Sequence, residues 1–207
     1  MKQIDEAVKT QIKEAIENAE RKSSCEFVTI ITQKSGNYRI YAFFVAALSA
    51  LLIPHLILWL TNWLSVEDVL RQQIVGFIFL MILTQLSFVT NLLVPSTIMQ
   101  RHASLVAAES FRKFGLYKTK KRRAVLFFVS MDERFATIIA DAGIEEKIDP
   151  LVWESIIETF RLNLNTKGIA QGYLEAIRAC GEILKLEFPV EEGDTDELPN
   201  NLIVDAE

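Results

Sequence analysis

Three acidic side chains recur at four-residue steps just after an apolar segment of the chain. They are Asp141, Glu145 and Asp149. A calcium ion requires several hard oxygen ligands of this kind. Arg122 and Arg123 precede the neighbouring apolar segment, however, and two cations beside three acids disfavour a metal ion. We therefore interpret these five residues as a candidate partner or ligand site, with no metal and no assigned catalytic residue.

Glu145 and Asp149 also have a structural interpretation. Glu145 is then an ordinary loop acid, and Asp149 is the N-cap of a helix that begins at Pro150. Aspartate is a favoured N-cap, and proline is tolerated in the first helical turn because its missing N–H would be unpaired there. Both interpretations of these acids remain open.

Other common catalytic arrangements find no support in the sequence. A Ser-His-Asp triad is excluded from the polar segments because His55 and His102 lie in or beside apolar runs. The chain has no glycine-rich phosphate loop and no Cys-x-x-Cys motif. Cys25 and Cys180 are isolated, which favours buried free thiols. We expect no cofactor.

A basic run spans Lys118–Arg123. Its charges are carried by Lys118, Lys120, Lys121, Arg122 and Arg123. One interpretation is a solvated loop whose charges help to fix membrane topology, and another is contact with anionic lipid headgroups. Each cation near such a surface contributes on the order of 1 kcal/mol. The net charge of −5 argues against nucleic acid as a partner.

Two long segments lack charged residues, one over residues 40–66 and one over residues 72–100. About 20 apolar residues suffice to cross a bilayer, so we predict spans at about 41–63 and 74–94. The segment Ser65–Arg71 is then a short polar connector. Inside the spans, His55 and Gln85 suggest either a transport path or hydrogen bonds between the two helices. Burial of both segments in a soluble core is the alternative to a membrane.

The distribution of lysine and arginine predicts the orientation of these spans. The connector carries only Arg71, whereas both flanks are rich in positive charge, which favours the cytoplasmic side. Residues 1–34 show no cleavable signal peptide, so insertion is expected to depend on the internal segments. We expect a multi-pass protein of the inner (plasma) membrane with both termini in the cytoplasm.

The polar segments alternate between helical and strand patterns. Apolar residues at three- and four-residue steps predict a helix over about 4–21, and β-branched residues predict a strand over 25–32. Later segments predict a helix up to Gly115, two strands joined by a tight turn, and two further helices. These strands span 124–130 and 135–141, the turn is Met131–Arg134, and the helices begin at Pro150 and Thr166. The acidic tail is expected to be extended or disordered.

Neither polar segment can bury its apolar faces alone, because one helix and one strand do not make a core. We therefore predict one small α/β sandwich domain built from both segments and interrupted by a two-helix transmembrane hairpin. The predicted limits are 1–38 and 98–188 for the two parts of the domain, 39–97 for the hairpin, and 189–207 for the tail.

Residues 107–188 resemble the TPM domain. The resemblance rests on the paired strands AVLFFVS and FATIIAD, on Ala142-Gly143-Ile144-Glu145 followed by Asp149, and on the later Thr166-Lys167-Gly168-Ile169 with Gly172. Residues 1–32 are similar to the opening helix and strand of the family. The chain looks closest to a bacterial branch in which a membrane hairpin interrupts the domain.

The resemblance implies a function as well as a fold. Members of the family are reported as weak acid phosphatases or calcium binders that use acids near the strand ends. The family usually carries Asp, Asn and Gly before the AVLFFVS strand, where this chain has Arg122 and Arg123. We therefore expect an interaction or regulatory module for a membrane complex, with the bilayer and another membrane protein or a second copy as partners. A weak phosphatase is the alternative.

Overall fold

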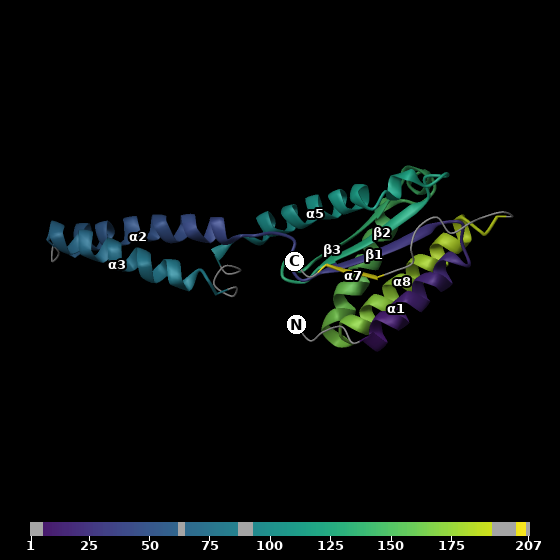
Figure 1. The fold of residues 1–207 in the computed structure, drawn as a ribbon, viewed down its shortest axis with the longest axis horizontal. Helices are drawn as coiled ribbons and strands as arrows, with labels where there is room; N and C mark the ends of the chain where they lie inside the picture. Colours follow the sequence, from purple (N-terminus) through teal and green to yellow (C-terminus); the bar gives the residue numbers. More distant parts are fainter. Residues whose placement is uncertain (1–5, 62–64, 87–92, 192–201, 206–207) are drawn as a thin grey trace. The chain divides into compact units, whose positions relative to one another are not determined.

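The computed structural model describes residues 6–61, 65–86, 93–191 and 202–205 (Figure 1). The chain divides into two compact units. One combines the residues up to Ser35 with those from Ala103 onwards, and the other is Gly36–His102. The first unit therefore draws on both ends of the chain, and each unit is described by itself below.

The first unit is built on a four-stranded sheet with the order β3-β2-β1-β4. The strands are β1 (Glu26–Thr32), β2 (Ala124–Ser130), β3 (Phe135–Ala140) and β4 (Leu202–Asp205). β1 and β2 run parallel and in register from the Glu26–Ala124 pair to the Thr32–Ser130 pair. β2 and β3 form an antiparallel hairpin, and β4 lies parallel to β1. The predicted α/β fold is therefore confirmed, with strands from both polar segments in one sheet.

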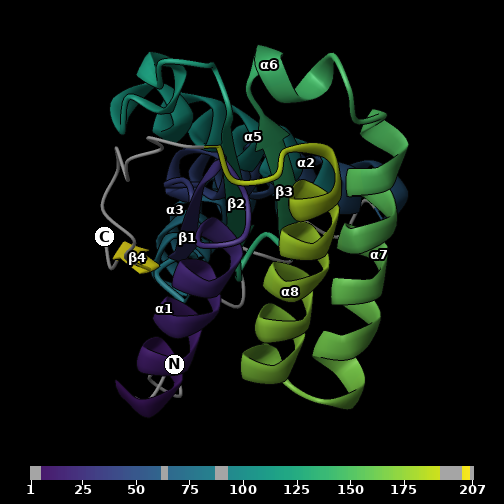
Figure 2. The ribbon, with the colours of Figure 1, turned by 90° about the vertical axis from the view of Figure 1, so that its right-hand side faces the viewer.

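Three helices cover one face of this sheet (Figure 2). They are α1 (Glu6–Glu20), α7 (Pro150–Thr166) and α8 (Ile169–Glu187). Because successive strand residues point to opposite faces, alternate residues of β2 such as Val125 and Phe127 meet these helices. The ring of Phe127 lies 5.2 Å from that of Phe160 and 4.7 Å from that of Tyr173. This aromatic cluster ties α7 and α8 to the centre of the sheet.

The other face of the sheet is covered by the last turns of α5 (Ser96–Lys113) and by the short helix η1 (Leu116–Lys118). Ala107, Phe111 and Leu116 pack there against the remaining residues of the strands, including Leu126 and Phe128. β2 is buried along its whole length, as expected of a central strand between two layers of helix.

The second unit contains α2 (Arg39–Thr61) and α3 (Val66–Leu83), which pack against each other. Along α2, the buried side chains are small and recur every fourth residue. They are Ala42, Ala46, Ala50 and Pro54. Small residues let two helix backbones approach closely. Phe43 meets Phe77 of α3 edge to face, with ring centroids 5.8 Å apart.

The second unit corrects one prediction about the spans and leaves another untested. Ser65–Arg71 is not a connector, because α3 begins at Val66, and Ser65 and Asp68 form a capping box at its start. Within the predicted second span, 74–94, α3 ends at Leu83, and residues 87–92 lie outside the described part of the chain, so this span stays a prediction. Among the described residues, Arg39–Leu60 is the one helical stretch long and apolar enough to cross a membrane, with a mean hydropathy of 2.2.

Part of the tail is extended, which is one of the two conformations expected for it. Residues Leu202–Asp205 form β4, which pairs with β1 from Thr29 to Thr32. The strand-like pattern in the tail covers only four residues, and these residues form a strand because they pair with β1. The open edge of β1 is thereby covered by the chain's own C-terminal segment.

Candidate functional site

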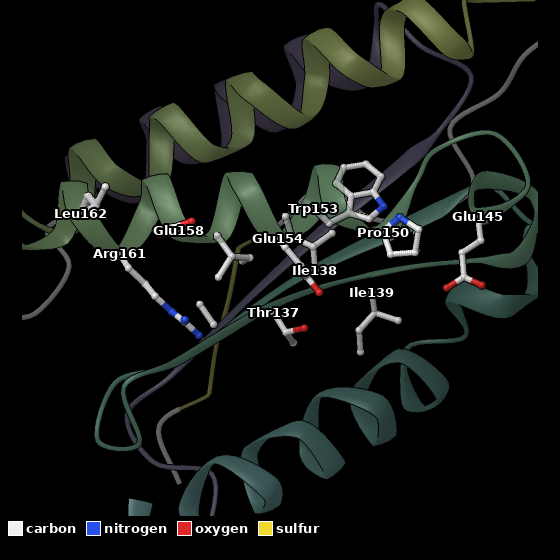
Figure 3. A pocket seen from close by; sticks show the side chains of 13 residues that line it. Thr137, Ile138, Ile139, Glu145, Pro150, Trp153, Glu154, Glu158, Arg161 and Leu162 are labelled. Atoms are coloured by element: carbon white, nitrogen blue, oxygen red, sulfur yellow. The ribbon is translucent and has the colours of Figure 1, made fainter. Parts of the chain in front are cut away.

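A groove of about 830 Å³ runs between β3 and α7 (Figure 3). Five consecutive residues of β3, 136–140, form one wall. The other wall is one face of α7, and Glu145 closes one end. The residues contributed by α7 are Pro150, Trp153, Glu154, Ile157, Glu158, Arg161 and Leu162. The groove thus joins a strand edge to a helix face.

β3 is the terminal strand of the sheet, so one of its edges has no strand neighbour among the described residues. The N–H of Asp141, just after β3, donates to the carbonyl oxygen of Ala124 at 2.9 Å. Backbone groups alternate in direction along an antiparallel strand, so those of Ala136, Ile138 and Ala140 point away from β2. These groups face the groove.

The start of α7 follows from its sequence. The Asp149 carboxylate accepts a hydrogen bond from the N–H of Leu151 at 2.8 Å, which makes it the N-cap, and Pro150 occupies the first helical turn. The structural interpretation of Asp149 is thereby confirmed. Trp153 comes one turn later and is only 6 % exposed. Its Nε1–H has no hydrogen-bond partner among the described residues.

The helix wall is predominantly acidic. Glu154 and Glu158 are exposed on α7, and Glu145 is exposed at the end of the groove. No ion pair within 4.0 Å involves these three carboxylates in the part of the chain that the structure describes. Arg161, on the same face, supplies one positive charge. A bound group would therefore meet a surplus of negative charge.

Arg122 and Asp141, both predicted site residues, form an ion pair. The Arg122 Nε donates to one carboxylate oxygen of Asp141 and Nη2 donates to the other, each at 2.7 Å. Asp141 also accepts a hydrogen bond from the N–H of Ala142 and so caps the short helix α6 (Ala142–Glu145). The hydrogen bond to Asp141 raises the pKa of Arg122 above its ordinary value. The carboxylate of Asp141 is thus fully engaged within the protein.

Gly143 explains why α6 sits so close to Arg122. The N–H of Gly143 donates to the carbonyl oxygen of Arg122 at 3.0 Å. A Cβ at position 143 would lie 2.5 Å from the carbonyl oxygen of Lys121 and 2.8 Å from that of Arg122. Only glycine fits this backbone contact, which brings the Ala142–Glu145 motif against the basic run.

The structure does not gather Asp141, Glu145 and Asp149 into one cluster. No group of three His, Cys, Asp or Glu side chains arranged to hold a metal ion is found among the described residues. Of the three, Glu145 lies in the groove, Asp141 is paired with Arg122, and Asp149 caps α7.

The basic run is partly neutralised within the domain. Lys121 and Arg123 both contact the carboxylate of Glu191, with an Arg123 Nη1 to Glu191 Oε1 distance of 2.7 Å. The hydrogen bonds from Lys121 and then Arg123 lower the pKa of Glu191 to about 2. Contact with lipid headgroups stays a prediction for Lys118 and Lys120. It also stays a prediction for Lys121, Arg122 and Arg123, which are paired with carboxylates.

Sequence reasoning missed a buried carboxylate in the turn between β2 and β3. Glu133 is 2 % exposed, and its carboxylate accepts hydrogen bonds from the N–H of Ser35 at 2.9 Å and from the hydroxyl of Ser130. The Ser35 hydroxyl donates to that of Ser130 at 2.7 Å. Ser35 is the last residue of the first unit before the helical unit. Glu133 therefore holds the chain where it leaves the domain, a role that a polar turn sequence does not indicate.

Comparison with known proteins agrees with this fold. The TPM domain family matches residues 87–183. The structure is similar to the NMR structure of the BA42 protein from the psychrophilic bacterium Bizionia argentinensis, with a TM-score of 0.59 and 18% identity over 97% of this chain and 94% of that chain. No match is found among curated proteins. The resemblance seen in the sequence is confirmed: the chain contains a match to the TPM domain over residues 87–183.

Proposed function

We propose that this chain is a membrane-anchored protein whose TPM domain is an interaction module for a membrane complex. The observation that carries the proposal is the surface of α2 and α3, where large apolar side chains are exposed along both helices. They include Phe44, Leu48, Leu52, Leu56 and Trp59 on α2, and Ile74, Ile78, Phe79 and Ile82 on α3. Contiguous apolar surface of this extent is unfavourable in water and fits the interior of a bilayer.

Strand pairing supports the proposed topology. β1 precedes the two apolar helices and β2 follows them, yet the two strands are neighbours in one sheet. Both flanks of the helical unit must then lie in the same compartment, which requires an even number of crossings. The excess of Lys and Arg on both flanks favours the cytoplasm. The proposed anchor is a two-span hairpin in the inner membrane with both termini cytoplasmic.

A binding role is supported by the contrast between two parts of the domain. Asp141 is bound by Arg122, whereas the groove between β3 and α7 presents a strand edge and carboxylates that have no partner among the described residues. The ion pair makes the Asp141 carboxylate unavailable as a metal ligand, and the groove offers a surface to which another protein can bind.

Two experiments test this proposal. After extraction of membranes at high pH, the full chain should stay in the pellet, and a version in which a flexible linker replaces residues 36–102 should be released. A photo-cross-linking residue at Glu154 should give a discrete adduct with a membrane protein, and the same residue at Arg178, on the exposed side of α8, should not. Release of the full chain would contradict the anchor. Phosphate release from p-nitrophenyl phosphate that Asp141→Asn abolishes would favour a phosphatase instead.

A further inference from the structure

We infer that the groove between β3 and α7 binds an extended, basic segment of a partner protein, which adds as a new strand to the edge of β3. The inference rests on the proposed interaction role and names the chemistry of the partner. Three features of the groove carry it: the backbone of β3, the small side chains beside that edge, and the charge on α7 (Figure 3).

The backbone of β3 supplies the attachment. The N–H and C=O groups of Ala136, Ile138 and Ala140 point away from β2, and an added strand would pair with them. The opposite edge of the same sheet already shows this mode of pairing, since β4 adds to β1 from a distant part of the chain. An exposed strand edge is a template for another strand unless something covers it.

The side chains beside the edge leave room for that strand. Ala136, Ile138 and Ala140 belong to the face of β3 turned towards α7, and the two alanines on either side of Ile138 have only a methyl group there. The largely buried ring of Trp153 forms part of the opposite wall.

The charge of the groove selects a basic segment. Glu154 and Glu158 lie one helical turn apart, which is about 6 Å along the helix axis. Alternate residues of a strand are separated by about 6.6 Å, so lysine or arginine at every second position matches this spacing. Pairing of β3 with the β3 of a second copy would instead bring two sets of these carboxylates together. The charges therefore favour a basic partner over self-association.

The test uses the full chain in detergent micelles and a defined peptide. The probe is fluorescein-labelled Lys-Val-Lys-Thr-Lys-Val, and fluorescence polarisation measures its binding. The double variant Glu154→Lys/Glu158→Lys should weaken binding by about tenfold or more, since two attractions become repulsions. Both positions are exposed, so the fold should be retained. Glu146→Lys, an exposed acid outside the groove, is the matched control and should bind as the unmodified chain does.

Two control peptides separate strand addition from simple charge attraction. A peptide with Glu in place of each Lys should not bind, and a Lys peptide methylated at every backbone nitrogen should lose binding because it cannot donate to β3. The inference is overturned if the probe does not bind, if the methylated peptide binds equally, or if the charge reversal has no effect. The inference would also be overturned if the unmodified chain forms a dimer and the double variant is a monomer, because the groove would then bind a second copy of the chain. If the peptide results contradict strand addition while the membrane anchor and the cross-linked adduct are both observed, the proposed function still holds.

Discussion

Arg122 binds Asp141 through two hydrogen bonds of 2.7 Å, one to each carboxylate oxygen. The Asp141 side chain is 4% exposed and that of Arg122 is 52% exposed, so the pair lies at the rim of the domain with the acid inside. A planar guanidinium that donates to both oxygens of a carboxylate forms an ion pair of specific geometry. It places a neutralised carboxylate at the start of α6, where the sequence resemblance alone suggests a reactive acid.

The first prediction concerns stability. Asp141→Ala removes the cap of α6 and the partner of Arg122, and loss of such a cap costs about 1–2 kcal/mol. Asp141→Asn should cost less, because its amide oxygen still accepts from the N–H of Ala142. Thermal unfolding of the full chain in micelles measures both variants, with the exposed Glu146→Ala as control. Equal stability of Asp141→Ala and Glu146→Ala would show that the pair is not structural.

The second prediction concerns calcium. With Asp141 bound to Arg122 and Asp149 capping α7, the described acids leave no cluster of hard ligands. Calorimetric titration of the full chain should therefore detect no calcium binding tighter than about 1 mM, the range of weak extracellular modules. Tighter binding that Asp141→Asn removes would contradict the structural role given to this carboxylate.

The third prediction concerns the dependence on pH. Glu191 is held by Lys121 and Arg123, which lower its pKa from an ordinary value of 4.5 to about 2. Because the pKa is lowered in the folded protein, the contact contributes stability above pH 4.5, and this contribution is lost as the pH falls towards 2. NMR titration of the Glu191 carboxyl should give a midpoint near 2, and Lys121→Gln should raise it. An unchanged midpoint in Lys121→Gln would rule out this ion pair in solution.

The fourth prediction concerns assembly of the domain. Residues 1–35 joined to 103–207 by about ten Gly and Ser residues should fold cooperatively, since such a linker spans roughly 16–19 Å. Residues 103–207 alone lack β1, which lies between β2 and β4, and should aggregate through the exposed edge of β2. Urea unfolding and light scattering distinguish the two. Equal stability of the shorter chain would show that β1 is not essential to the domain.

Much of the domain could be predicted because its elements carry strong local patterns. The unbroken apolar run Ala124–Ser130 predicts a buried strand and is β2. Asp149 and Pro150 predict a helix start, and the structure confirms both the cap and the first turn. These features depend on neighbouring residues alone, and for that reason a single sequence reveals them.

Other features depend on contacts between distant residues. The strand β4 is short and exists through its pairing with β1, and Glu133 becomes a buried acceptor only because Ser35 lies beside it. The groove follows from β3 being the terminal strand and from the position of α7 beside it. The error at Ser65 had a local cause, because its charged neighbours suggest a connector, whereas Ser65 and Asp68 together cap a helix.

In the proposed topology, two apolar helices anchor a domain whose two halves lie on one side of the membrane. Single cysteines at Lys9, Val66 and Arg112 test it, since Val66 begins α3 and the other two lie in α1 and α5. In intact cells, a membrane-impermeant maleimide should label the cysteine at position 66 only. Positions 9 and 112 should become labelled together after the cells are permeabilised. Labelling of all three positions in intact cells, or of positions 9 and 112 from opposite sides of the membrane, would contradict this topology.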